Sequence, residues 1–256
     1  MPVALTDIVD PKQRVTVAEF ERRLAKLSRR HRTMIRDALG SPPDPSNIPQ
    51  SLWDRIEREH RAALTILLYG ASLATLGVAL GRMNRSGTTL DDVESVHQAL
   101  DQQAAARATW VAESVTGTSR SRLDRLNSEE PPELETVLRE TFGSERMSSI
   151  ARNEAVAAQA LGGSSLASVI RQQDGNVTEI WHLGDCEHCE VCPMLHLTAR
   201  EFWGQWSDGP PLHPNCRCFL QVEFDHPTVL TQQGRVRSRN PSYGIVNQKM
   251  SKFARK

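Results

Sequence analysis

The segments DCEHCEVC (185–192) and HPNCRC (213–218) contain all five cysteines of this 256-residue chain. Random placement would not gather every cysteine into so small a part of the sequence. Each segment offers two soft ligands within about one turn of chain, and a loop of about twenty residues joins the two segments. Because ligands at this spacing can meet one metal ion at about 2.3 Å, the pattern predicts a tetrahedral zinc site.

Five thiols compete for at most four ligand positions in this site. We expect the ligands to be Cys189, Cys192, His213 and Cys216. Cys218 is the alternative to His213 and would give an all-thiolate site. Cys186 ranks last among the cysteines, although its spacing to Cys189 also suits a ligand pair.

The predicted zinc is structural rather than catalytic. A catalytic zinc keeps one open position beside a general base, whereas this chain has enough ligands to close the site. Neither the H-E-x-x-H motif nor the deaminase pattern occurs. Residues 1–17 contain no apolar signal segment, so we expect a reducing compartment, and disulfides are the weaker alternative. A bound metal would stabilise a segment too small to bury an adequate core.

The two cysteine segments belong to a longer pattern. Its members are Trp181, Asp185, Cys189, Cys192, PPLHPNCRC (210–218) and, upstream, IARNE (150–154). Together they resemble the phage head-morphogenesis family typified by the F protein of phage Mu, which has an Ala-Arg-Thr-Glu element and a C-terminal zinc motif. Asn153 stands where that family has threonine, and Cys186 is additional. The resemblance covers residues 110–225.

This resemblance implies a minor head protein of a tailed phage or prophage, acting in head morphogenesis and in DNA packaging or ejection. It implies association with the portal protein, the major capsid protein or both, and multiple copies per virion. The expected location is the phage head, after assembly in the host cytoplasm. In such a protein the zinc performs no chemistry and fixes a docking surface.

Two other classes of function stay open. A zinc-dependent nuclease would use His213 and the basic segments, but the sequence offers no open coordination site with a nearby base. A membrane-active ejection protein would use the uncharged run AALTILLYGASLATLGVAL, which begins at Ala62, ends at Leu80 and is long enough to cross a bilayer. Polar residues and glycines in this run favour a helix buried on all sides in a bundle or between subunits, so we expect no membrane partner.

Helical periodicity predicts a mainly α-helical body with a small zinc-stapled α+β module near the C-terminus. The predicted domains are an N-terminal arm with a basic helix (1–48), a helical body (49–173), a zinc-binding module (174–225) and a basic extended tail (226–256). Within the module, residues 177–183 and 219–224 are predicted to form paired strands, because both follow strand-like patterns and they flank the metal ligands.

A capping box of Thr16 and Glu19 predicts the start of the first helix, and Gly40 predicts its end. Periodic apolar residues predict later helices over 49–80, 90–116, 144–161 and 164–172, with interruptions at 116–122 and 162–163. Trp110 is expected to anchor the core. Arg152 and Glu154 are expected to form a structural charged pair rather than a catalytic group, because no second acid or nucleophile accompanies them.

The charge is balanced over the whole chain, with a formal net charge of zero, but it is not evenly distributed. Arginines crowd one face of the first predicted helix, and residues 226–256 contain no acidic residue. Candidate contacts in this tail are Arg235, Arg237, Arg239, Lys249 and Lys252. The tail is predicted to order on a partner, either packaged DNA or an acidic protein surface.

Overall fold

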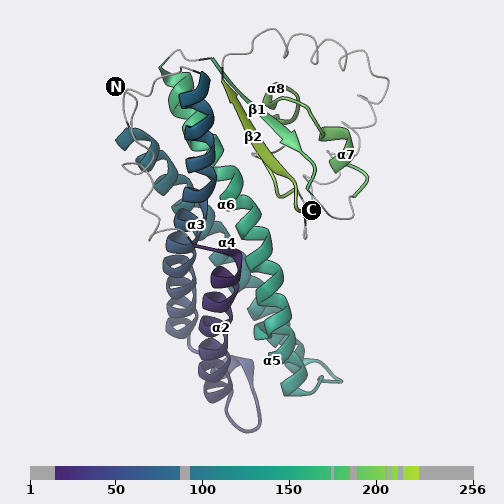
Figure 1. The fold of residues 1–256 in the computed structure, drawn as a ribbon. Coiled ribbons are helices and arrows are strands. Elements are labelled where there is room, and N and C mark those ends of the chain that lie inside the picture. The colour runs from purple at the N-terminus through teal and green to yellow at the C-terminus, as the bar shows by residue number, and fades with distance from the viewer. Residues whose placement is uncertain are drawn as a thin grey trace. The chain divides into compact units, whose positions relative to one another are not determined.

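The computed structural model describes residues 15–86, 93–173, 176–184, 189–205, 207, 209–212 and 216–224 (Figure 1). The long helices are α2 (Val17–Leu39), α3 (Gln50–Ser86), α4 (Val93–Leu123), α5 (Leu134–Phe142) and α6 (Ser144–Gln172). The short elements are η2 (Pro45–Asn47), η3 (Asp124–Asn127), α7 (Cys192–Leu195), α8 (Arg200–Trp203), β1 (Val177–His182) and β2 (Phe219–Phe224). The predicted mainly α-helical fold with a small α+β part near the C-terminus is confirmed.

The described residues divide between two compact units. The bundle unit comprises Val15–Tyr69 and Asp101–Ala155, and the sheet unit comprises Gly70–Leu100 and the described part of Val156–Lys256. The long helices α3, α4 and α6 each contribute residues to both units. The four-part division expected from the sequence stays a prediction.

Helix α2 of the bundle unit begins and ends as its capping residues predict. The Thr16 hydroxyl accepts a hydrogen bond from the Glu19 backbone N–H at 3.2 Å, which satisfies a donor that the first turn leaves open. Gly40 ends the helix with a φ of 77°, a backbone conformation that glycine adopts readily. Both predicted helix boundaries are confirmed.

An apolar core joins α2 to α3, α4 and α5 in the bundle unit. Its buried residues include Ile35, Leu39, Trp53, Ile56, Leu123, Leu138 and Phe142. These side chains recur at the three- and four-residue spacing that places them on one face of each helix. Burial of this shared face is the main term that stabilises the unit.

A buried histidine pair lies between α2 and α3. His31 and His60 are both almost fully buried, and their ring centroids are 4.6 Å apart. Nε2 of His31 lies 2.8 Å from a carboxylate oxygen of Glu59, and Nδ1 of His60 lies 3.1 Å from the backbone oxygen of Ile56. Nδ1 of His31 and Nε2 of His60 have no hydrogen-bond partner among the described residues. Burial, followed by the positive charge of a protonated His31, lowers the pKa of His60 to about 3.

We expect the protein to lose stability as the pH falls from about 6.5 to about 3, because the unfolded chain protonates His60 near its ordinary pKa and the folded chain does not. The free energy of unfolding should fall by up to about 1.4 kcal/mol per pH unit in this window. The charge of Glu59 raises the pKa of His60 and so opposes this loss of stability, whereas the charge of Arg146 lowers that pKa further. Urea unfolding at several pH values measures the slope. His60→Gln should flatten the slope of stability against pH, and a slope equal to that of the parent protein would contradict the assignment.

The sheet unit is built on two antiparallel strands. Val177 pairs with Phe224 at one end of the sheet, and His182 pairs with Phe219 at the other. On β2, the buried Leu220 and Val222 alternate with more exposed neighbours, whereas β1 is buried from Val177 to Trp181. The predicted strand pair is therefore confirmed, but β1 lies deeper than its alternating sequence suggests.

The glycines at 162 and 163 do not break a helix, contrary to the sequence prediction. Helix α6 runs without interruption from Ser144 to Gln172, and α4 likewise continues through residues 116–122. A Cβ atom on Gly162 would lie 2.3 Å from the backbone oxygen of Ser72 in α3. The glycine therefore permits close helix contact in the sheet unit, and this packing outweighs its low helix propensity.

Gly162→Ala should lower the free energy of unfolding by about 1–3 kcal/mol, because the added methyl group must displace the α3 backbone. The matched control is Gly117→Ala in α4, where an added Cβ has no atom within 4 Å. This control should stabilise the protein by about 0.5–1 kcal/mol through its helix propensity. Chemical denaturation of the two variants gives the comparison, and a stabilising Gly162→Ala would show that α3 and α6 are not in close contact.

The uncharged run 62–80 lies within α3. By length and composition, the segment Gln50–Met83 could cross a membrane, and 56% of its most apolar window is buried in the protein. Ile66 and Val78 nevertheless remain exposed. Burial on all sides is thus not reached within the single chain.

Trp110 is not a core anchor. Its side chain is 58% exposed, and the guanidinium carbon of Arg107 lies 4.7 Å from its ring centroid. The neighbouring Ala108 and Val111 occupy the buried face of α4 instead. The prediction that Trp110 anchors the core was wrong. Large aromatic residues are usually buried, but the helical period places Trp110 outside the apolar stripe of α4.

Candidate metal centre

The sheet register brings the two cysteine segments together. His182 ends β1 opposite Phe219, which begins β2, so the chain leaving one strand lies beside the chain entering the other. Cys192 begins α7 after β1, and Cys218 directly precedes β2. Residues 197–199 return to β1, where the Trp181 N–H donates to the Thr198 oxygen at 2.9 Å. This contact fixes the end of the loop that starts at Cys192.

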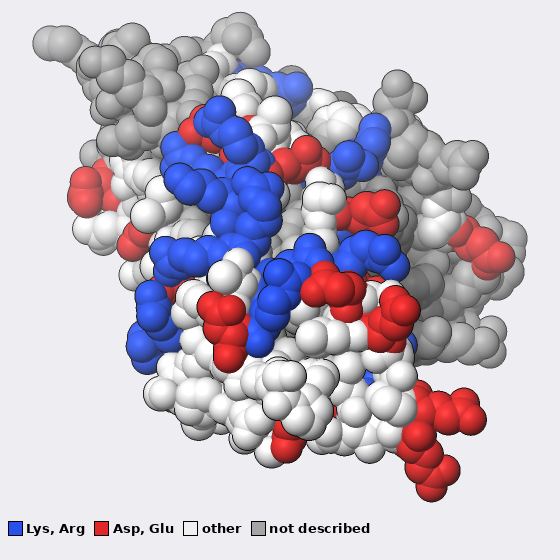
Figure 2. Space-filling view, turned by 90° about the horizontal axis from the view of Figure 1, so that it is seen from below, with Lys and Arg blue, Asp and Glu red and all other residues white. Residues whose placement is uncertain are grey.

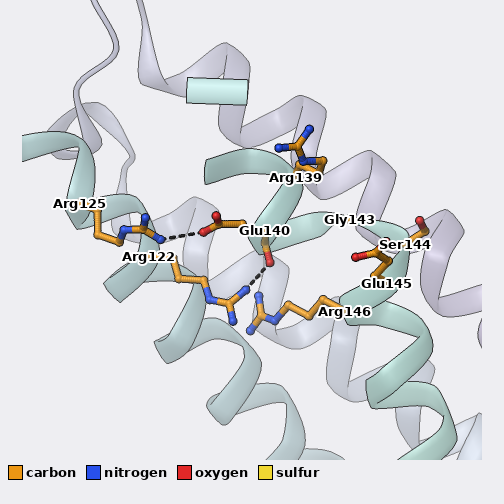
Figure 3. Close-up of a pocket in the computed structure, with 8 residues that line it drawn as sticks. All are labelled: Arg122, Arg125, Arg139, Glu140, Gly143, Ser144, Glu145 and Arg146. Carbon is orange, nitrogen blue, oxygen red and sulfur yellow. Dashed lines mark hydrogen bonds and ion pairs between the residues drawn. The ribbon is translucent and has the colours of Figure 1, made fainter. Parts of the chain in front are cut away.

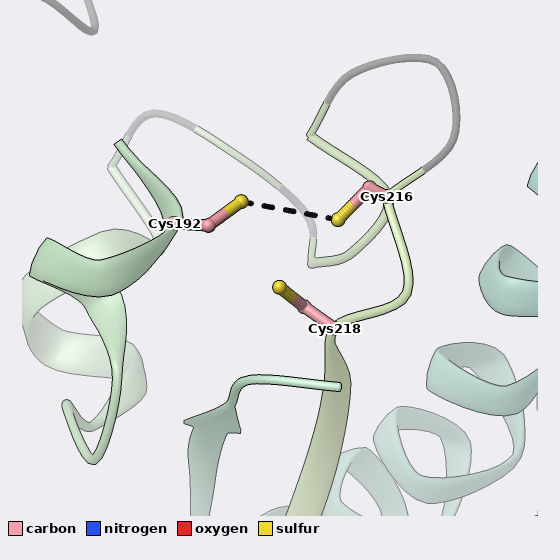
Figure 4. Close-up of side chains that lie close together, drawn as sticks. All are labelled: Cys192, Cys216 and Cys218. Carbon is pink, nitrogen blue, oxygen red and sulfur yellow. Dashed lines mark hydrogen bonds between the residues drawn. The ribbon is translucent and has the colours of Figure 1, made fainter. Parts of the chain in front are cut away.

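Three cysteines converge at this end of the sheet, and a fourth, Cys189, lies beside one of them. The side chains of Cys192, Cys216 and Cys218 point toward one another in Figure 4, and their sulfur atoms all lie within 4.8 Å of one another. Cys192 Sγ is 4.0 Å from Cys216 Sγ and 3.5 Å from Cys189 Sγ. The backbone N–H of Cys192 also donates to the sulfur of Cys189 at 3.4 Å. All four thiols are free rather than joined in disulfides.

These separations fit a tetrahedral metal site. Sulfur atoms at about 2.3 Å from a tetrahedral zinc ion stand about 3.8 Å from one another. Cys192 Sγ lies at comparable distances from Cys189 Sγ, 3.5 Å, and from Cys216 Sγ, 4.0 Å. A disulfide would require a sulfur–sulfur distance of about 2.05 Å. The cluster can therefore hold a metal ion with little rearrangement of its side chains.

The surroundings of the cluster are apolar. Cys192, Cys216 and Cys218 are buried in one hydrophobic core with Trp181, Trp203, Val191, Leu195 and Leu220. Trp181 and Trp203 meet edge to face with ring centroids 5.6 Å apart, and both belong to the same core as the three cysteines. Phe202 packs at the edge of the same core. Apolar surroundings strengthen any charge interaction inside them.

The crowded thiols cannot all ionise without a cation. The hydrogen bond to Cys216, then the hydrogen bond to Cys218 and burial, raise the pKa of Cys192 far above its ordinary value. The same hydrogen bond, with Cys192 as the donor, lowers the pKa of Cys216. Several thiolates this close together in an apolar core would repel one another. A divalent cation would offset the repulsion among several thiolates.

The sequence-predicted ligands fall into two groups. Cys192 and Cys216 lie in the three-sulfur cluster, Cys189 lies beside Cys192, and Cys218, the alternative to the predicted histidine, is the third member of the cluster. His213 and Cys186 are outside the described residues, as are the tail residues Arg235, Arg237, Arg239, Lys249 and Lys252. The three buried sulfurs of the cluster could hold a metal ion.

A buried glutamate supports the centre and was missed by sequence reasoning. Glu179 in β1 is fully buried, yet its carboxylate accepts hydrogen bonds from Arg171 at 2.5 Å and from Arg200 at 3.1 Å. The Ser164 hydroxyl donates to it at 2.5 Å. Glu179 thus ties β1 to α6 and α8. The available signal was an acidic residue on the strand face that also carries Val177 and Trp181.

Arg152 and Glu154 do not pair with each other. Glu154 accepts two hydrogen bonds from the guanidinium of Arg107, at 2.7 and 2.8 Å, and Arg152 pairs with Glu21 at 2.9 Å. Both residues therefore hold helices of the bundle unit together. The sequence motif could not reveal these partners, because they lie far away along the chain.

No protein-family model matches this chain, and neither the curated proteins nor the solved structures include a match.

Proposed function

We propose that the protein is a minor head protein of a tailed phage, in which a structural zinc ion is held by Cys189, Cys192, Cys216 and Cys218. The observation that carries the proposal is the cluster of three buried thiols at the end of the sheet, with the half-buried Cys189 beside Cys192. Zinc is the metal that such an all-thiolate tetrahedral set most commonly binds. The family assignment rests on the resemblance of the cysteine segments and residues 150–154 to head-morphogenesis proteins.

A structural role agrees with the donor set. Four thiolates would leave no coordination position for water or substrate, so the metal would act as a cross-link. The cross-link would fix the surface formed by β1, β2 and the loops around α7 and α8. In a head protein, this surface would dock on the portal protein or the major capsid protein. The basic tail with Arg235, Arg237 and Arg239 would contact packaged DNA or the same acidic partners.

The metal is tested by elemental analysis of protein purified without added metal. We expect about one zinc ion per chain, as a single tetrahedral site requires. A chelator should remove the zinc and unfold the sheet unit, which circular dichroism would record. Absence of zinc from folded protein, or its removal without structural change, would reject the zinc staple.

The head function is tested by deleting the coding sequence in the phage that carries it. We expect few or no DNA-filled heads in electron micrographs of the lysate, with rescue by the parent sequence. We also expect the protein in purified virions by mass spectrometry. Normal numbers of infectious particles without the protein would reject this role. Metal-dependent nicking of plasmid DNA that disappears in a His213 variant would instead favour the nuclease.

A further inference from the structure

A second candidate site lies in the bundle unit, between the end of α4 with η3 and the junction of α5 with α6. It is a pocket of about 640 Å³, within the size range of small-molecule sites. We call it the arginine pocket. Its lining residues are Arg122, Arg125, Arg139, Glu140, Gly143, Ser144, Glu145 and Arg146, drawn in Figure 3.

The charges of the arginine pocket do not balance. Four arginines face two glutamates, which leaves a formal excess of two positive charges. Arg125 pairs with the Glu140 carboxylate at 2.7 Å. Among the described residues, Arg122, Arg139 and Arg146 have no ion pair with a carboxylate. Unneutralised guanidinium groups in a concave site are an anion-binding arrangement.

Two of the free charges lie next to each other. Arg122 donates to the backbone oxygen of Glu140, and Arg146 donates to the next backbone oxygen, that of Thr141, at 2.5 Å. Figure 3 shows their guanidinium groups together on the side of the pocket opposite Arg139. Burial, followed by the charge of Arg122, lowers the pKa of Arg146 to about 10. Arg146 also donates to the Ser119 hydroxyl at 3.1 Å and to the Val115 backbone oxygen at 3.4 Å. These neutral acceptors do not neutralise the charges, and each guanidinium has five N–H donors, so donors remain for a ligand.

The start of α6 adds a further feature that favours an anion. Ser144, Glu145 and Arg146 form the first turn of this long helix and line the pocket. The first N–H groups of a helix have no partner inside the helix and carry a partial positive charge. This feature reinforces the arginines and would not make a site without them.

We propose that the arginine pocket binds a phosphate group, carried either by free phosphate compounds or by the backbone of a nucleic acid. A phosphate monoester carries a charge close to −2, which matches the excess charge of the pocket, whereas a single carboxylate neutralises only half of it. Each phosphodiester of a nucleic-acid backbone carries a charge of −1, so two successive phosphates would neutralise the pocket. The planar guanidinium fork also fits phosphate oxygens in pairs. Basic side chains gather into a broad band on the face seen in Figure 2, which would attract such anions from solution.

Binding is tested with two probes on the full-length protein. The first is inorganic pyrophosphate in isothermal titration calorimetry, and the second is a fluorescein-labelled single-stranded oligonucleotide in an anisotropy titration. The test variant is Arg122→Gln with Arg139→Gln, which removes two of the unneutralised charges. The matched control is Arg58→Gln, which removes one exposed arginine outside the pocket. Arg139→Gln alone serves as a second test variant, because its exposed side chain makes only a 3.5 Å contact to Thr136. Circular dichroism checks that each variant is folded.

We expect the double variant to bind pyrophosphate at least about tenfold more weakly than the parent, with a smaller loss for Arg139→Gln and none for Arg58→Gln. If a nucleic-acid backbone is the source, the oligonucleotide affinity of the double variant falls as well. The slope of its log binding constant against log salt concentration should then be smaller by about two, one for each lost phosphate contact. If free phosphate compounds are the source, only pyrophosphate binding falls. The basic tail is the same in all variants, so it does not affect the comparison.

Three results would overturn the proposal. The parent protein binds neither probe, the double variant binds pyrophosphate as tightly as the parent, or polyglutamate binds at these arginines while pyrophosphate does not. The last result would assign the pocket to an acidic protein segment. None of these outcomes depends on the cysteine cluster, so the zinc proposal stands or falls separately.

Discussion

Cys192→Ser is expected to abolish metal binding and to unfold the sheet unit. Cys192 contacts both Cys189 and Cys216, so its loss removes the thiol that joins the two halves of the cluster. Structural zinc sites contribute on the order of 10 kcal/mol to folding, which is comparable with the whole stability of a small domain. Elemental analysis should find less than about one tenth of the parent zinc content, and the remaining three thiols should not hold the metal.

The control for this variant is Cys186→Ser, because that residue ranks last among the candidate ligands. It should keep both its zinc content and its circular dichroism spectrum.

A further pair of variants separates the possible ligand sets. If the four cysteines bind the metal, Cys218→Ser loses zinc and His213→Ala keeps it, whereas the histidine-containing set gives the reverse. A Cys192→Ser protein with normal zinc and normal fold would remove the basis of the proposed centre.

Glu179→Ala should have the second largest effect, a loss of about 3 kcal/mol in the free energy of unfolding. The substitution leaves the side chains of Arg171 and Arg200 without their shared carboxylate. Breaking a buried ion pair usually costs about 3–5 kcal/mol, and we expect the lower end because these arginines are 36% and 33% exposed. Urea denaturation followed by tryptophan fluorescence measures the change.

The matched control is Glu223→Gln on the paired strand. Glu223 accepts a hydrogen bond from Gln221 at 2.8 Å and is not buried, so its loss should change stability by less than about 0.5 kcal/mol. Folded Glu179→Ala should still bind about one zinc per chain, since the carboxylate supports the strand and is not a ligand. Equal stability of the two variants would show that the Glu179 network contributes nothing net.

Local sequence signals predicted much of the fold. Thr16, Glu19 and Gly40 act through contacts within a few residues, so the ends of α2 could be predicted without knowledge of any partner helix. The two strands were also recognisable, since they flank the cysteine segments. Predictions were wrong where tertiary packing determines the local structure. Gly162 lies in a continuous helix because α3 passes close to it, and the sequence around residue 162 contains no sign of that neighbour.

The candidate sites show the same division. The short spacing between Cys189 and Cys192 predicts a pair of metal ligands. The second short segment, which contains Cys216 and Cys218, predicts the other half of the site. The choice between Cys218 and a histidine depends on where the chain enters β2, which spacing alone leaves open. The arginine pocket could not be predicted, because Arg122 and Arg146 come from helices whose contact is set by the fold.

The strand register described above has a consequence for the order of folding. His182 and Phe219 are neighbours in the sheet but are separated by about 36 residues, and closing such a loop in the unfolded chain costs about 3 kcal/mol of entropy. A metal that first bridges Cys192 and Cys216 leaves only about 12 residues to close, which lowers this cost by about 1 kcal/mol. Zinc captured early would thus shorten the conformational search for the sheet. The metal would act as a nucleus from which the strands find their register, as well as a cross-link in the finished protein.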